Sequence, residues 1–125
     1  MRKFFSITLL IVALSGTAPS GARSASEVFL SGVDDLPLMT GLVEDINSAI
    51  VFDSASGRYV EAFAEGLVTA DAVNTFYTAT LPQLGWRKTG NFTFEREDEV
   101  LMLEISQDAA SAGAIQVRFV LSPKK

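Results

Sequence analysis

TADAVNTFYTATLPQLGW, residues 69–86, contains a helix start, an apolar stripe and a helix stop, and the rest of the chain is organised around it. Thr69 is a predicted N-cap, since its hydroxyl can accept a hydrogen bond from a free amide of the first turn. Asp71 places negative charge where the helix dipole favours it. The side chains that follow recur at steps of three and four residues, which predicts one amphipathic helix: Val73, Phe76, Tyr77, Thr80, Leu81 and Leu84.

The end of this helix is marked by a proline and a glycine. Pro82 has no amide to donate to the carbonyl of Thr78, so we expect a kink or a tightened last turn. Gly85 can adopt the left-handed conformation that ends a helix. Trp86 would then begin a strand and lie against the helix end. Such a stripe usually packs into a core. The alternative is a ligand groove along Tyr77 and Trp86.

Strand patterns lie on both sides of the helix. AIVFD (49–53) and RYVEAFAE (58–65) are separated by a short turn, which predicts a hairpin. After the helix, alternating apolar residues mark further short strands at 86–88, 92–96, 99–106 and 115–121. The sequence therefore predicts an α+β fold with a single antiparallel sheet of about five strands and one helix packed across one face, in the order β-β-α-β-β-β.

Residues 1–24 have the pattern of a secretory signal peptide. Arg2 and Lys3 precede the apolar run FFSITLLIVAL (4–14), and small residues follow it. The run is 11 residues long, shorter than the ~20 that a transmembrane helix needs. No later stretch is apolar enough to span a membrane. We expect cleavage and a periplasmic or secreted protein; an uncleaved anchor is the alternative.

The composition limits what the exported part can do. Loss of Arg2, Lys3 and Arg23 lowers the basic count from 10 to 7 against 15 acidic residues, so the net charge changes from −5 to −8. Such an acidic protein is not expected to bind nucleic acid or anionic lipid through bulk charge. The chain has no Cys, so it has neither a disulfide nor a lipidated cysteine, and its fold must depend on its hydrophobic core.

Residues 25–47 form the least regular part, which we expect to precede an α+β domain over residues 48–125. Leu36, Leu38 and Met39 lie on a stretch stiffened by Pro37. These apolar side chains either close one end of the core or dock a partner. They are the candidate partner contacts.

The inventory of reactive side chains predicts no catalytic, cofactor-binding or metal-binding residues. The chain has no His and no Cys, which excludes Ser–His–Asp and Cys–His catalysis within it and zinc sites built on those ligands. Carboxylates remain, and two that converge could hydrolyse a glycosidic bond. The acidic run at 95–99 is better explained as a solvated turn.

Several motifs together resemble small exported bacterial proteins and lipoproteins of unknown function. They are Phe76-Tyr77, Leu84-Gly85-Trp86, FTFER (92–96) and LMLEI (101–105), within a region of resemblance over residues 48–121. The resemblance implies a helix that leads into a β-meander, similar to helix-grip domains such as those of a lipoprotein in the outer-membrane barrel-assembly machinery. The chain differs from the lipoprotein members because it lacks the lipidated Cys.

We therefore expect an exported, non-catalytic binding or accessory module of the cell envelope. Its expected partner is an envelope protein, not nucleic acid, and it needs no cofactor. The sequence does not predict an oligomeric state. The alternatives are a small carboxylate-dependent hydrolase acting on cell-wall glycan and a carrier of a small apolar ligand, which would need a cavity between helix and sheet.

Overall fold

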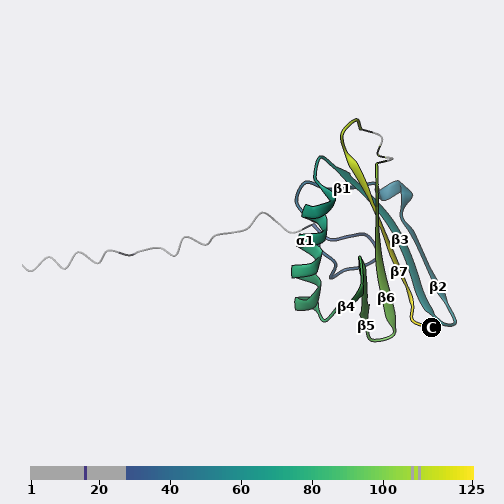
Figure 1. Cartoon of the computed structure of the whole chain (residues 1–125). Coiled ribbons are helices and arrows are strands. Elements are labelled where there is room, and N and C mark those ends of the chain that lie inside the picture. The colour runs from purple at the N-terminus through teal and green to yellow at the C-terminus, as the bar shows by residue number, and fades with distance from the viewer. Residues whose placement is uncertain (1–15, 17–27, 108, 110) are drawn as a thin grey trace, which may run out of the picture.

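In the part of the chain that the structure describes, one α-helix packs against one antiparallel sheet (Figure 1). The structure is a computed structural model that describes residues 16, 28–107, 109 and 111–125. The helix is α1 (Ala70–Thr80), and short 3₁₀ turns occur at η1 (Ile46–Ser48) and η2 (Leu81–Leu84). The strands are β1 (Val43–Glu44), β2 (Ile50–Ser54), β3 (Gly57–Gly66), β4 (Arg87–Gly90), β5 (Thr93–Arg96), β6 (Glu99–Ser106) and β7 (Ile115–Pro123).

The predicted α+β class is confirmed, but the predicted strand count and order are wrong. The sheet has seven strands, three before the helix and four after it, whereas about five in the order β-β-α-β-β-β were expected. Its order is β1-β3-β7-β6-β5-β4, and β2 also pairs with β3. The two residues of β1 are too few to show an alternating pattern, so this strand has no sequence signal of its own.

The helix begins and ends as its capping residues predict. The Thr69 hydroxyl accepts a hydrogen bond from the amide of Ala72 at 3.0 Å. Pro82 lies in η2, the tightened turn that follows α1. Gly85 has a φ of 91°, in the left-handed region that favours glycine, and ends this turn. The strand begins at Arg87, one residue later than predicted, because the Trp86 amide still bonds to the carbonyl of Leu81 at 3.0 Å.

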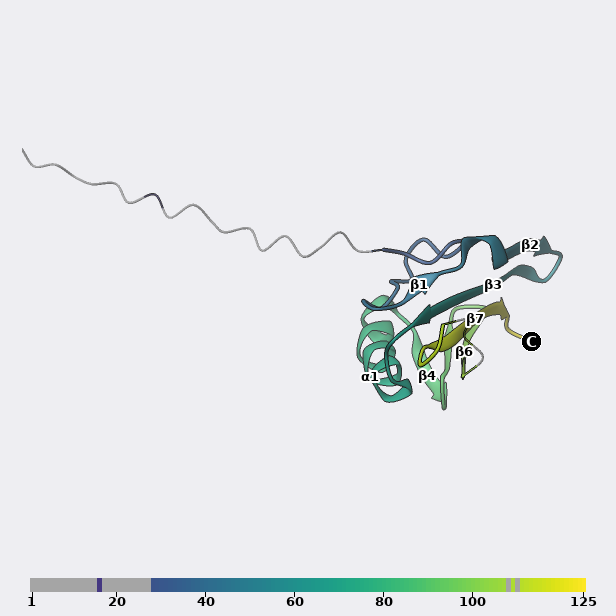
Figure 2. The same ribbon diagram turned by 90° about the horizontal axis from the view of Figure 1, so that it is seen from above.

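The core lies between the helix and the facing side chains of the sheet. Figure 2, the view from above, shows α1 against one side of the curved sheet. The small apolar side chains on one face of β3 and the alternating apolar side chains of β7 are both buried. The ring of Tyr77 meets Phe119 of β7 edge-on, with centroids 5.5 Å apart. The buried strand residues are Val60, Ala62, Ala64, Phe94, Leu101, Leu103, Ile115, Val117, Phe119 and Leu121.

The domain begins earlier than residue 48. Leu30, Val33, Leu36 and Leu42 are buried in the same core as the sheet and helix, and β1 pairs with β3. The segment 28–47 is thus part of the fold, although it was expected to be irregular. Its burial depends on partners far along the chain, which local sequence patterns do not reveal. The predicted signal peptide over residues 1–24 lies outside the described residues, apart from Gly16.

Trp86 provides a test of the core. Its side chain is only 2% exposed, and the Arg96 guanidinium lies 4.3 Å from its ring centroid. We predict that Trp86→Ala lowers the free energy of unfolding by about 3–5 kcal/mol, as for other large core aromatics. Denaturant titration followed by circular dichroism measures this loss.

Trp86→Phe is the matched control. The Trp86 Nε1 is buried without a hydrogen-bond partner among the described residues, so removing it sacrifices no hydrogen bond. The phenylalanine variant should therefore lose less stability than the alanine variant. A loss below about 1 kcal/mol for Trp86→Ala would contradict the buried position of this ring.

Candidate functional site

A hollow of about 700 Å³ lies between the N-terminal segment and the helix, and it is partly open to solvent. Its lining is mainly apolar. The N-terminal segment contributes one wall, and the end of α1 with η2 contributes the other. The apolar side chains along it include Val28, Phe29, Leu38, Met39, Phe76 and Leu84.

The N-terminal wall is held in place by backbone hydrogen bonds. The amide of Leu38 donates to the carbonyl of Val28 at 2.7 Å, beside an antiparallel bridge between Phe29 and Pro37. The amide of Leu30 donates to the carbonyl of Leu36 at 2.9 Å. The wall is therefore a short two-stranded ribbon, although it contains no long strand.

Tyr77 joins this wall to the helix. Its hydroxyl donates to the carbonyl of Pro37 at 3.0 Å and accepts a hydrogen bond from the amide of Met39 at 3.2 Å. The side chain is 1% exposed, and burial raises the pKa of Tyr77 far above its ordinary value. The hydroxyl consequently keeps its proton and remains a donor at any physiological pH.

The predicted site residues separate into two groups. Leu38 and Met39 are half-buried and line the hollow, as a docking role requires. Leu36 has no exposed surface, because its amide closes a turn onto the carbonyl of Val33 and its side chain enters the core. It therefore cannot contact a partner in this conformation.

The predicted groove along Tyr77 and Trp86 is not formed. Both side chains are buried, at 1% and 2% exposure, and neither lines the hollow. The N-terminal segment covers Tyr77, and the Arg96 side chain covers Trp86. Phe76 was assigned to the core stripe by its helical spacing, but its half-buried side chain also faces the hollow.

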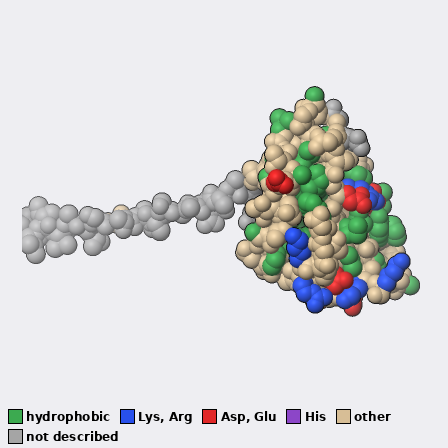
Figure 3. Space-filling view, in the orientation of Figure 1, with side chains coloured by type: hydrophobic (Ala, Val, Ile, Leu, Met, Phe, Trp, Pro, Cys, Tyr) green, Lys and Arg blue, Asp and Glu red, His purple; other side chains and the backbone are tan. Residues whose placement is uncertain are grey.

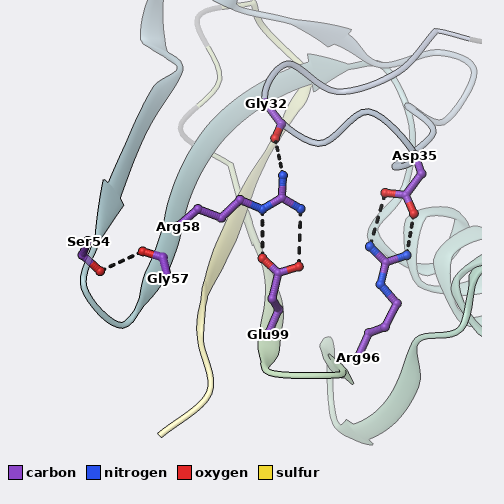
Figure 4. Close-up of polar contacts among 7 residues, drawn as sticks. All are labelled: Gly32, Asp35, Ser54, Gly57, Arg58, Arg96 and Glu99. Carbon is purple, nitrogen blue, oxygen red and sulfur yellow. Dashed lines mark hydrogen bonds and ion pairs between the residues drawn. The ribbon is translucent and has the colours of Figure 1, made fainter.

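An ion pair fixes the polar rim of the hollow. The Arg96 guanidinium donates two hydrogen bonds to the carboxylate of Asp35 (Figure 4). One of its nitrogens also donates to the carbonyl of Leu84 at 3.0 Å. The hydrogen bond from Arg96 holds the pKa of Asp35 below its ordinary value. Arg96 thus ties the N-terminal wall to the end of η2.

A second ion pair ties the N-terminal segment to the sheet. The Arg58 guanidinium pairs with Glu99 at 2.9 Å and donates to the carbonyl of Gly32 at 3.1 Å (Figure 4).

Lys and Arg side chains gather mostly at the lower end of the molecule in Figure 3, the end at which the chain terminates. Apolar surface lies above them on the same face.

Several acidic side chains form ion pairs with arginine, among them Glu61. Glu61 accepts from Arg118 at 2.9 Å and from the Tyr59 hydroxyl at 2.9 Å, and these contacts lower the pKa of Glu61. A general acid for glycoside hydrolysis needs a raised pKa, which is the opposite shift. Within residues 28–107 and 111–125, no three acidic groups converge as a metal site would require.

No family model matches this chain, and no curated protein or solved structure is significantly similar to it. The site must therefore be interpreted from its own residues. In the part of the chain that the structure describes, no helix is both long and apolar enough to cross a membrane.

The Asp35–Arg96 pair predicts a stability effect that depends on pH. The lowered pKa of Asp35 means that the pair's stabilisation is complete above the ordinary value of 3.8 and is lost as pH falls through the lower folded-state pKa. Because the Asp35 side chain is 48% exposed, we expect Asp35→Asn to cost only about 0.2–1 kcal/mol at pH 7. The melting temperature should fall by a few degrees at pH 7 and match the wild type near pH 2.

Asp34→Asn is the control, since this exposed neighbour makes no hydrogen bond or ion pair among the described residues. Its melting temperature should follow that of the wild type across the whole range. An Asp35→Asn protein that also follows the wild type at every pH would show that the ion pair contributes nothing.

Proposed function

We propose that this protein is an exported, non-catalytic binding or accessory module of the cell envelope, and that the hollow is its binding site. The observation that carries the proposal is the hollow itself, with apolar walls supplied by two separate parts of the chain. Its volume of about 700 Å³ lies within the range of ligand pockets, ~300–1,000 Å³.

The walls are ordered before anything binds. Tyr77 fixes the loop at Pro37 and Met39, and Arg96 fixes it at Asp35. A site held in this way loses little conformational entropy when a ligand binds. Met39 adds a flexible side chain that can adapt to an apolar surface. These features support recognition of an apolar group, with Asp35 and Gln83 supplying polar contacts at the rim.

Two kinds of ligand fit this chemistry. An apolar side-chain cluster of an envelope protein would make the protein an accessory module. The volume also suits a small apolar molecule, which favours the carrier as the second candidate. The directions of the pKa shifts of Asp35 and Glu61 give no support to the glycan hydrolase.

Export is the first part of the proposal to test. We expect the protein from a periplasmic extract of a Gram-negative host to begin between Arg23 and Ser26, because small residues follow the short apolar run. N-terminal sequencing measures this directly. Recovery of the chain from the cytoplasm with Met1 intact would contradict it.

Val28→Asp tests the hollow. Val28 lines the hollow but is 60% exposed, so a carboxylate there should repel apolar ligands and leave the melting temperature nearly unchanged. Leu38 and Met39 are less suitable, because they also pack on the core. We expect wild type to bind a neutral apolar fluorescent probe such as N-phenyl-1-naphthylamine, and Val28→Asp to bind it at least tenfold more weakly.

Leu67→Asp is the matched control, since Leu67 is an apolar residue with 78% exposure that does not line the hollow. It introduces the same charge and should leave probe binding unchanged. In-cell cross-linking with the same three proteins then distinguishes a protein partner from a small ligand. Equal probe binding by all three would exclude the hollow as the binding site.

A further inference from the structure

The exposed apolar residues of β2 form a feature that the hollow does not explain. Ile50, Val51 and Phe52 are 47%, 55% and 52% exposed, and all five residues of the strand are exposed. Three consecutive large apolar residues are rarely left so open on the surface of a monomer.

β2 also lies at an open edge of the sheet. Its register with β3 runs from Ile50 opposite Glu61 to Ser54 opposite Gly57, and it has no second strand partner among the described residues. Figures 1 and 2 both place it at the margin of the sheet. In an antiparallel pair, about half of the backbone amides and carbonyls of an edge strand point outward and can bind another strand.

The opposite edge of the sheet, at β4, is protected against pairing with another strand, whereas β2 is not. β4 carries the exposed Arg87 and Lys88, and its pairing with β5 shifts register between Lys88 and Gly90. Charged side chains and irregular pairing are the usual devices that prevent edge strands from associating. β2 has no Lys, no Pro and no shift of register, and Asp53 is its one charged residue.

The side chains on one face of β2 and β3 provide an apolar surface against which the side chains of an added strand can pack. Ile50 and Phe52 share this face with Tyr59 and Glu61, their partners on β3. The rings of Phe52 and Tyr59 stack with centroids 5.0 Å apart, and the Tyr59 hydroxyl donates to Glu61. These contacts hold the exposed Phe52 ring in place before a partner binds.

Charge at the two ends of β2 indicates which partner fits. At one end, the exposed Asp45 lies level with Phe63 of β3, because its amide bonds to the Phe63 carbonyl at 2.8 Å. At the other end, Lys125 lines a small hollow together with Phe52, whereas the Lys124 ammonium is paired with Glu95 of β5 at 3.5 Å. Two antiparallel copies of β2 would bring the Lys125 end of each copy toward the Asp45 end of the other.

We propose that β2 pairs antiparallel with β2 of a second copy of this chain, about a two-fold axis at Val51. This register places Val51 opposite its symmetry mate and Ile50 opposite Phe52 in both directions, so every central pair is apolar. A register centred on Phe52 would instead set Asp53 opposite Val51. The result is one continuous sheet across two copies.

The absence of native cysteine allows this register to be tested directly. Residues opposite each other across antiparallel strands lie about 4.5–5.5 Å apart at Cα, within the range that a disulfide spans. Under mild oxidation, Val51→Cys should form a disulfide-linked dimer at least tenfold faster than Leu67→Cys, whose exposed side chain lies away from β2. Phe52→Cys tests the other register.

Sedimentation of the unmodified chain supplies the second measurement. A five-residue edge gives a small interface, so we expect a dimer that dissociates in the micromolar range. Phe52→Lys should weaken association at least tenfold, and Leu67→Lys should not; circular dichroism checks that both variants fold. A monomer at all concentrations with no excess cross-linking at Val51 would overturn the proposal. Faster cross-linking at Phe52 than at Val51 would overturn the register.

Discussion

The contacts of one buried tyrosine hold the three parts of this fold together. The Tyr77 side chain extends from the helix, its ring packs on Phe119 of the sheet, and its hydroxyl bonds to the backbone at Pro37 and Met39. A ring of this size contributes several kcal/mol through burial, and its two hydrogen bonds prevent the cost of leaving buried polar groups unpaired. The chain has no Cys, so no disulfide can replace these contacts.

Arginine side chains reinforce the same arrangement from the outside. Arg96 covers Trp86 and joins Asp35 to the carbonyl of Leu84, and Arg58 joins Glu99 to the carbonyl of Gly32. In both cases one guanidinium bonds to a carboxylate and a backbone carbonyl from different parts of the chain, a use that suits its planar set of donors. Exposed ion pairs contribute little stability. Their larger effect here is to orient the N-terminal segment.

The parts of the fold that could be predicted are those with a local signal. Thr69, Pro82 and Gly85 mark the helix and its end, and the alternation of β6 and β7 marks their buried faces. β1 and the 28–42 segment could not be predicted, since the partners that place them on the rest of the fold lie far along the chain: β1 pairs with residues 20 and 22 positions later, and Tyr77 bonds to residues 38 and 40 positions before it. For the same reason, Leu36 was grouped with Leu38 and Met39, although only the latter two line the hollow.

The N-terminal segment that lines the hollow also contacts β2, through Gly32. Gly32 has a φ of 82°, and a Cβ there would lie 2.8 Å from a Cγ of Val51 and 3.1 Å from one of Val60. Glycine therefore allows the segment to pass directly beneath β2. A few residues further on, the same segment forms the wall that Tyr77 holds. The two proposed binding surfaces thus depend on one backbone path, which the long-range hydrogen bonds of Tyr77 and Arg58 hold in place.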